Sequence, residues 1–269
     1  MSKYYQELFN REELKLTEKE SIDIIVDWKD KNGNYDLRHL VHFIAPDLDL
    51  QEFLDIKGLY IGKNILRQEY GFEKNQKPGD FDLIIIPYTD SGIHFERTGV
   101  CEVKVVRPTR KKPLKNANSL GITQLNGLIN DGFPFVGIVH ISLTELLEDE
   151  EKLDIDFCTI PANGDEKIEK GEKLSDYFVN VKMDHFQWFS VDKQITRLVS
   201  TEIPKYVALM CFGLTKKSDK EYWMETVSRK YLGFETGYFN PNSRKETIKK
   251  VRKHFLKNQE KYEKKTIKK

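Results

Sequence analysis

Short apolar runs separated by turn residues set the pattern of this chain. The runs at 81–88 and 100–106 are rich in Ile and Val, and the residues 89–92 between them form a polar turn. Because β-branched residues favour strands and a short turn joins antiparallel neighbours, these runs predict two paired antiparallel strands. Residues 133–142 form another apolar run, which predicts a strand that is buried on both of its faces.

Other segments carry apolar residues at helical spacing. They predict four helices, at 21–29, 36–44, 51–66 and 120–129. In the third of these, Phe53, Ile56 and Tyr60 mark the apolar face. The fourth lies between two predicted strands, an order that is typical of a crossover between parallel strands. Candidate strands continue further along the chain, at 153–160, 178–183 and 206–214.

This order of elements predicts an α/β fold in which helices flank a central mixed β-sheet. With 269 residues, the chain is at the upper edge of one domain, or it is one domain with extensions. We expect an N-terminal helical extension at 1–50, a core with insertions at 51–215 and a C-terminal extension at 216–269. The last of these ends in a basic tail that is expected to be helical.

The composition excludes several classes of protein. Hydrophobic residues make up 39% of the chain, which is enough for a packed core, and no apolar run is long enough to cross a bilayer. The first residues show no apolar signal segment. The three cysteines are scattered, without the paired spacing of a zinc site, and are typical of free thiols in a reducing compartment. We therefore expect a cytoplasmic protein without a membrane partner.

Charged residues interrupt two of the predicted strands. Asp82 lies near the start of one, and Glu102 and Lys104 lie in the other. Since alternate side chains share a face of a strand, Glu102 and Lys104 point to the same side and Val103 points to the other. Two carboxylates beside an ammonium group are what metal-assisted phosphodiester cleavage requires. The alternative is structural: Asp82 begins a strand after a turn, and Glu102 and Lys104 form an ion pair on an exposed face.

Asp82, followed by Glu102-Val103-Lys104 and then by a predicted helix that opens with Gln124, resembles the motif of the PD-(D/E)xK nucleases. The resemblance implies a restriction-endonuclease-like core. It also implies that Asp82, Glu102 and the carbonyl oxygen of Val103 bind Mg²⁺ or Mn²⁺. Lys104 would assist the attacking water, and Gln124 would support the site.

Three further acids are weighed for the same site. Asp80 lies two residues before Asp82 and competes with it as a metal ligand, although it is closer to the turn. Many members of the superfamily carry a Glu on a helix before the two strands, and Glu52 and Glu69 are the candidates here. For both of them the favoured interpretation is surface charge.

The resemblance, which covers residues 50–145, predicts a Mg²⁺-dependent nuclease that hydrolyses phosphodiester bonds in DNA, in restriction, host defence or repair. RNA stays open as a substrate, and so does assembly into a homodimer or a larger nuclease complex. A second hypothesis is a catalytically inactive nucleic-acid-binding or assembly module on the same fold. A third is a scaffold that docks a larger enzyme through its aromatic C-terminal half.

Basic residues gather in two places. The loop after the second charged strand has five that are suited to bind phosphates beside the metal: Arg107, Arg110, Lys111, Lys112 and Lys115. The alternative is a solvated connection. The tail at 240–269 has 12 Lys and Arg against 3 Asp and Glu, which favours a solvated helix over an arm that grips phosphates.

Overall fold

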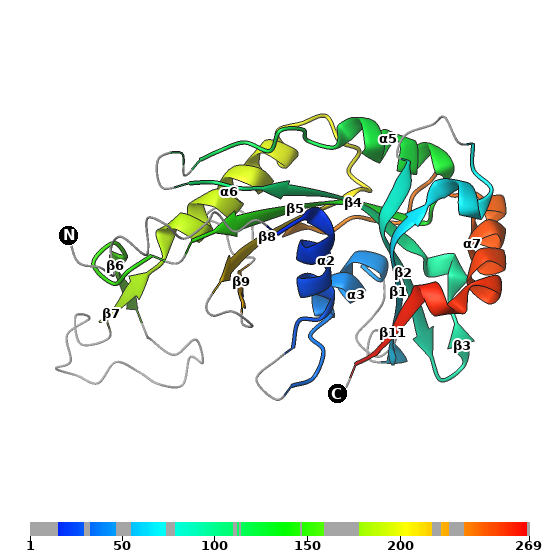
Figure 1. The fold of residues 1–269 in the computed structure, drawn as a ribbon, viewed down its shortest axis with the longest axis horizontal. Coiled ribbons are helices and arrows are strands. Elements are labelled where there is room, and N and C mark those ends of the chain that lie inside the picture. Colours follow the sequence, from blue (N-terminus) through cyan, green and yellow to red (C-terminus); the bar gives the residue numbers. More distant parts are fainter. Residues whose placement is uncertain are drawn as a thin grey trace, which may run out of the picture.

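A mixed, curled β-sheet forms the centre of the molecule, and helices flank it on both faces (Figure 1). The computed structural model describes residues 16–29, 33–46, 55–73, 79–109, 112, 114–145, 147–158, 178–216, 222–225 and 234–267. Within these ranges the α/β class predicted from the sequence is confirmed. None of the helices there is both long and apolar enough to cross a bilayer.

Seven strands lie side by side across the main sheet. Their order is β10 (Phe234–Glu235), β8 (Ala208–Lys216), β5 (Phe135–Thr144), β4 (Gly99–Val106), β2 (Asp80–Thr89), β1 (Gly58–Leu66) and β11 (Tyr262–Thr266). Two short strands are added to it, β3 (Gly92–Ile93) on β2 and β9 (Tyr222–Glu225) on β8. The pairs β4–β5 and β5–β8 are parallel, and the other pairs are antiparallel.

Helices cover the sheet in two layers. On one face, α2 (Glu18–Val26) and α3 (Arg38–Ile44) close a first apolar core. Three helices close a second core on the other face: α5 (Ile122–Asp131), α6 (His185–Val199) and α7 (Lys245–Lys257). Within the described residues there are also three short 3₁₀ helices: η1 (Arg67–Tyr70), η2 (Phe95–Arg97) and η4 (Gln259–Lys261).

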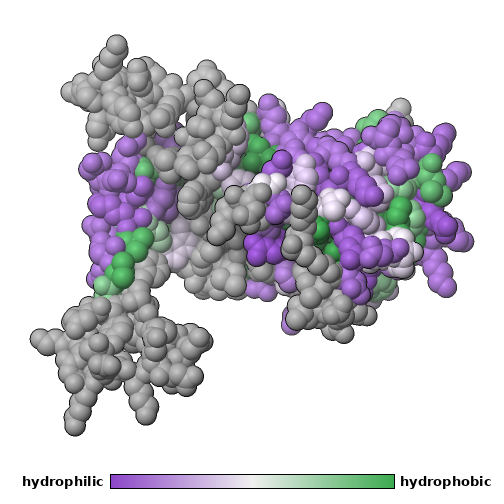
Figure 2. All heavy atoms as spheres, turned by 90° about the horizontal axis from the view of Figure 1, so that it is seen from below, coloured by the Kyte–Doolittle hydropathy of each residue, from purple (hydrophilic) through white to green (hydrophobic). Residues whose placement is uncertain are grey.

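A separate antiparallel pair, β6 (Leu153–Cys158) and β7 (Phe178–Met183), lies at one end of the molecule (Figure 1). It leaves hydrophobic side chains in solvent, among them Leu153, Val179 and Val181. The space-filling view shows a short hydrophobic strip at the same end, beside hydrophilic atoms (Figure 2). The rest of the described surface in that view is largely hydrophilic.

Most of the predicted elements are confirmed. The strands expected at 81–88, 100–106 and 133–142 are β2, β4 and β5, and their antiparallel and parallel pairings are as predicted. The later candidate strands are β6, β7 and β8. The predicted helices at 21–29, 36–44 and 120–129 are α2, α3 and α5. Cys101 and Cys211 are buried free thiols. The domain boundaries stay predictions. The basic tail is helical only in part, because β11 near its end is a strand that pairs with β1.

The helix predicted at 51–66 is wrong, because residues 58–66 form the strand β1. Leu59 and Ile61 enter the first core, while Tyr60 enters the second. Because β1 lies between two strands and is covered on both faces, it has no polar alternation that marks it as a strand. The first residue of β1 is a glycine because the strand β11 lies very close to it: a Cβ on Gly58 would lie 2.1 Å from the backbone oxygen of Lys265. Residues 51–54 lie outside the described residues.

The sequence analysis did not predict α6. This helix begins at an N-cap residue, Asp184, whose carboxylate accepts from the backbone N–H groups of Phe186 and Gln187. Its buried residues then recur at helical spacing through Val191 and Ile195. A capping residue followed by this period was the available signal.

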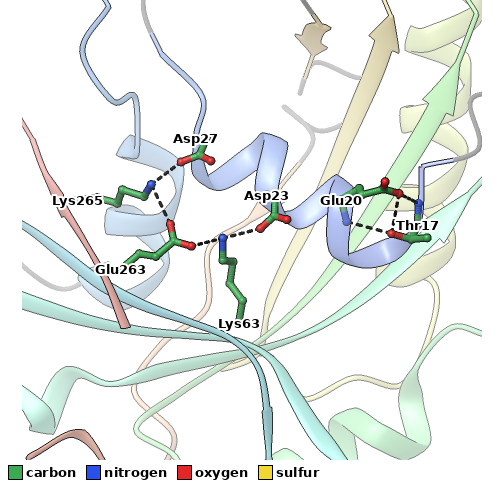
Figure 3. A network of polar contacts seen from close by, with 7 residues as sticks. All are labelled: Thr17, Glu20, Asp23, Asp27, Lys63, Glu263 and Lys265. Carbon is green, nitrogen blue, oxygen red and sulfur yellow. Dashed lines mark hydrogen bonds and ion pairs between the residues drawn. The ribbon is translucent and has the colours of Figure 1, made fainter. Parts of the chain in front are cut away.

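A network of ion pairs fastens α2 to the sheet (Figure 3). Lys63 of β1 contacts Asp23 of α2, at 2.5 Å, and Glu263 of β11. Lys265 of β11 contacts the same Glu263, at 2.9 Å, and Asp27 at the C-cap of α2. The network therefore joins the first described helix to the last strand of the sheet.

Replacing Lys63 by Met should lower the free energy of unfolding by about 1–3 kcal/mol, because Asp23 and Glu263 lose the ammonium group between them. The side chain of Lys63 is only 14% exposed, so water compensates poorly. The control is Lys57→Met, since Lys57 pairs with Asp90 in solvent and should matter by less than about 1 kcal/mol. Urea unfolding measures both, and equal effects would contradict the role given to the network.

Candidate active site

The predicted acids lie where β2 and β4 separate. The pairing of these strands runs from Ile85 opposite Gly99 to Leu83 opposite Cys101. Asp82 is the next residue on β2, and its Oδ2 atom accepts a hydrogen bond of 2.7 Å from the backbone N–H of Val103 on β4. The carboxylate thus joins the two strands at the point where their backbone pairing ends.

The neighbouring strand β1 is irregular at the same level. Lys63 lies opposite Leu83 and Ile65 opposite Phe81, whereas Asn64 between them has a φ of 50°. A non-glycine residue in the left-handed region distorts the strand at this position, although the register with β2 is the same on both sides of it. Asp82, which would face Asn64 in this register, therefore lies beside a distorted position of β1 and next to the end of the β2–β4 pairing.

Lys104 stands at the centre of the polar contacts. Its Nζ atom lies 2.5 Å from Oε1 of Glu102 and donates a hydrogen bond of 2.9 Å to the carbonyl oxygen of Val103. The same Nζ lies 3.8 Å from Oε2 of Glu18, the first residue of α2. The structure therefore brings Asp82, Glu102 and Lys104 together, and it adds an acid from the N-terminal helix.

The N-terminus of α5 closes the other side of this cluster. Gly121, its N-cap residue, has a φ of 78°. A Cβ at this position would lie 3.2 Å from Cγ of Glu102 and 3.4 Å from Cγ of Lys104. Glycine is suited here because it adopts this φ without strain and lets the helix approach the two side chains.

Burial makes the two carboxylates hard to ionise. Asp82 is 6% exposed and Glu102 is 3% exposed. Burial, followed by the charge of Glu102, raises the pKa of Asp82 to about 8. Burial also raises the pKa of Glu102, although its bond to Lys104 opposes the shift. Each acid therefore lacks enough positive charge nearby to offset its desolvation.

The ammonium group of Lys104 behaves in the opposite way. Burial disfavours its charge, but the bond to Glu102 and the surrounding acids outweigh burial, and its pKa is raised. Burial raises the pKa of Glu18, with Lys104 opposing the shift and Asp80 adding to it. Four acids thus share one lysine within this cluster, which makes the site attractive to a cation.

The described residues contain no group of three or more His, Cys, Asp or Glu placed to hold a metal ion. Mg²⁺, however, commonly takes only one or two protein carboxylates and completes its shell with water and phosphate oxygens. Asp82 and Glu102 each keep one oxygen without a hydrogen bond in the described part of the chain. The donor set therefore fits a hard divalent cation held by two carboxylates.

Other predicted site residues lie further from the cluster. Gln124 is in the first turn of α5, and within the described ranges its side chain has no hydrogen bond to Asp82, Glu102 or Lys104. Arg107 donates through Nη2 to the carbonyl oxygen of Leu16, at 2.5 Å, and so holds the segment that leads into α2.

The basic loop is described only in part. Lys112 and Lys115 are exposed, as a phosphate contact requires. Arg110 and Lys111 lie outside the described residues, so their predicted role stays a prediction.

An acid on a helix that precedes the two strands does lie near Lys104, but it is Glu18, which was not among the predicted candidates. Glu69 instead contacts Lys261 and His254, so its interpretation as structural surface charge is confirmed, and Glu52 lies outside the described residues. The signal for Glu18 was the capping box, in which Thr17 and Glu20 bond each other's backbone N–H groups and so begin a helix at Glu18.

His140 is a buried neighbour of the site. It lies beside Lys104 in the parallel pairing of β4 and β5, and its Nε2 atom is 3.3 Å from the carbonyl oxygen of Leu120. Burial lowers its pKa to about 4, so the ring is neutral in the folded protein.

No family model matches this chain, and neither the curated proteins nor the solved structures yield a match.

His140 should make stability fall in acid. Its pKa is lower in the folded state than the ordinary value of 6.5, so the unfolded chain binds the extra proton as the pH falls below that value. Between about pH 7 and about pH 5, the protein should lose about 2 kcal/mol more than a His140→Asn variant. Urea unfolding at several pH values measures this difference, and parallel curves would contradict it.

Proposed function

We propose that this chain is a metal-dependent nuclease of the PD-(D/E)xK type, which hydrolyses phosphodiester bonds in DNA. The observation that carries the proposal is the cluster of Asp82, Glu102 and Lys104 at the divergence of β2 and β4. The mixed sheet flanked by helices supports it at the level of the fold class. The preference for DNA rests on the resemblance of the motif, because these residues do not distinguish DNA from RNA.

Asp82 and Glu102 would hold Mg²⁺ or Mn²⁺, and the carbonyl oxygen of Val103 is a third donor on the same strand as Glu102. When bound, such an ion acidifies water and neutralises charge on the phosphate. The single lysine does not offset the burial that raises the pKa of both carboxylates, so a divalent cation bound there would favour their ionised forms.

Lys104 acts through its position and its charge. Its bonds to Glu102 and to the carbonyl of Val103 fix the ammonium group beside both carboxylates. The raised pKa keeps it protonated at neutral pH. It can therefore orient the attacking water through a hydrogen bond and stabilise the negative charge that develops on the phosphate.

One observation favours the second hypothesis, an inactive nucleic-acid-binding or assembly module. The ammonium group of Lys104 already occupies an oxygen of Glu102 and the carbonyl of Val103, which are two of the three proposed donors. An inactive module would bind nucleic acid equally in EDTA and in Mg²⁺ and would leave it uncut. Oligomeric state and cytoplasmic location stay predictions.

In Mg²⁺, the parent protein should cut supercoiled or linear plasmid DNA. Glu102→Gln and Lys104→Ala should each slow cleavage by about 10²-fold or more, because the first removes a charged ligand of the cation and the second removes the ammonium group beside the reacting phosphate. The control is Glu96→Gln, which changes an exposed carboxylate in η2. Gel assays of initial rates, with EDTA as a blank, measure the effect. Cleavage that survives both substitutions would refute the site.

Glu18→Gln should slow cleavage by about tenfold, because the carboxylate 3.8 Å from Lys104 helps to hold the ammonium group and adds negative charge beside the cation. Glu20→Gln is the matched control on the same helix, since Gln preserves the capping box. Cleavage rates are measured over a range of Mg²⁺ concentrations. The Glu18→Gln variant should need more Mg²⁺ than the parent to reach half of its maximal rate. Identical rates for the two variants would remove Glu18 from the site.

A further inference from the structure

A groove of about 780 Å³ lies between α5 and α7. Thr123, Asn126 and Asn130 line it from α5, and Thr247 and Lys250 line it from α7. Three acids line it as well: Asp131, which pairs with Arg67, Glu246, which pairs with Lys249, and the exposed Glu73. Both walls consist largely of groups that form hydrogen bonds, which suits a polar ligand.

The α5 wall leads to the candidate active site. Thr123, Asn126 and Asn130 are exposed and uncharged, and they follow one another at spacings of three and four residues on one face of the helix. Thr123 is two residues from Gly121, which packs against Glu102 and Lys104. At about 1.5 Å per residue, the wall runs from about 3 Å to about 14 Å beyond Gly121.

Beyond Glu246, whose carboxylate pairs with Lys249, α7 carries a stripe of lysines. Lys250 is held in place, since its Nζ donates to the carbonyl oxygen of Gly71 at 2.9 Å and lies 4.1 Å from the centre of the Phe72 ring. Lys253 and Lys257 continue the same stripe of the helix, both exposed. In the described part of the chain, none of these three lysines forms an ion pair.

The spacing of the lysines distinguishes a polymer from a small anion. Lys250, Lys253 and Lys257 extend over about 10 Å along α7. A single phosphate is too small to contact all three, whereas a nucleic-acid strand presents one phosphate for about every 3.4 Å of duplex axis. Threonine, asparagine and lysine side chains are also among the groups that contact the nucleic-acid backbone.

We propose that the groove between α5 and α7 binds the sugar–phosphate backbone of the DNA substrate. The bound part of the strand is the part that extends along α5, away from the bond that is cleaved beside Gly121. The proposal rests on the proposed nuclease function. It gives part of the basic C-terminal region a role as a phosphate-binding surface, in addition to the loop at 107–115. The amides of α5 fix the position of the strand, and the lysines of α7 supply most of the attraction.

The test is binding of a fluorescein-labelled DNA duplex in EDTA, by anisotropy at several salt concentrations. Lys250→Gln with Lys253→Gln should weaken binding by about tenfold at about 0.1 M salt and make the salt dependence shallower by about two phosphate contacts. The matched control is Lys245→Gln with Arg252→Gln, which removes two charges from the opposite exposed stripe of the same helix. The control should bind within about twofold of the parent.

Equal losses in the two double variants, or no loss in either, would overturn the proposal, and so would a parent protein that binds no DNA. If the loss of the contact with Phe72 unfolds the first variant, Lys253→Gln with Lys257→Gln replaces it, because neither side chain has a contact of this kind. The readout is separate from catalysis. A parent that cuts no DNA in Mg²⁺ would refute the nuclease, while a selective loss of binding in the groove variant would still support the groove.

Discussion

The hydrogen bond from the backbone N–H of Val103 to the carboxylate of Asp82 is the constraint on which the site depends. β2 and β4 stop pairing through their backbones at this level, and a side chain takes over the connection. Without this bond, a carboxylate that is 6% exposed would be buried with little to compensate its desolvation. The bond also fixes Asp82 beside the strand that carries Glu102 and Lys104, so one contact sets both the shape and the charge of the cluster.

The sequence revealed those parts of the fold in which a local pattern and the tertiary structure agree. β2, β4 and β5 are apolar runs with clear turns, and Glu102 and Lys104 were recognised because charge is rare within such runs. β1 was mistaken for a helix because burial on both faces removes the alternation that identifies a strand. Glu18 could not be placed, since only the packing of α2 against the sheet brings it near Lys104, 86 positions further along the chain.

The chemistry and the proposed binding surface meet at α5. Its N-cap, Gly121, packs on the lysine and the glutamate of the cluster, and its exposed face forms one wall of the groove. A short helix that touches both can hold a DNA strand in a fixed relation to the acids, which is how binding away from the reacting bond contributes to catalysis. The neighbouring His140 stays uncharged and adds no second cation to the site.

The pairing of β11 with β1, together with the ion pairs that join β11 to α2, has a consequence for biosynthesis. β11 lies at residues 262–266, so a ribosome must translate 200 further positions after Lys63 before Lys63 meets Glu263. Contacts between residues so distant in the chain form late in folding. Until then the helix that carries Glu18 is held by Lys63 and by the bond from Arg107 to Leu16, without the contacts from Glu263 and Lys265.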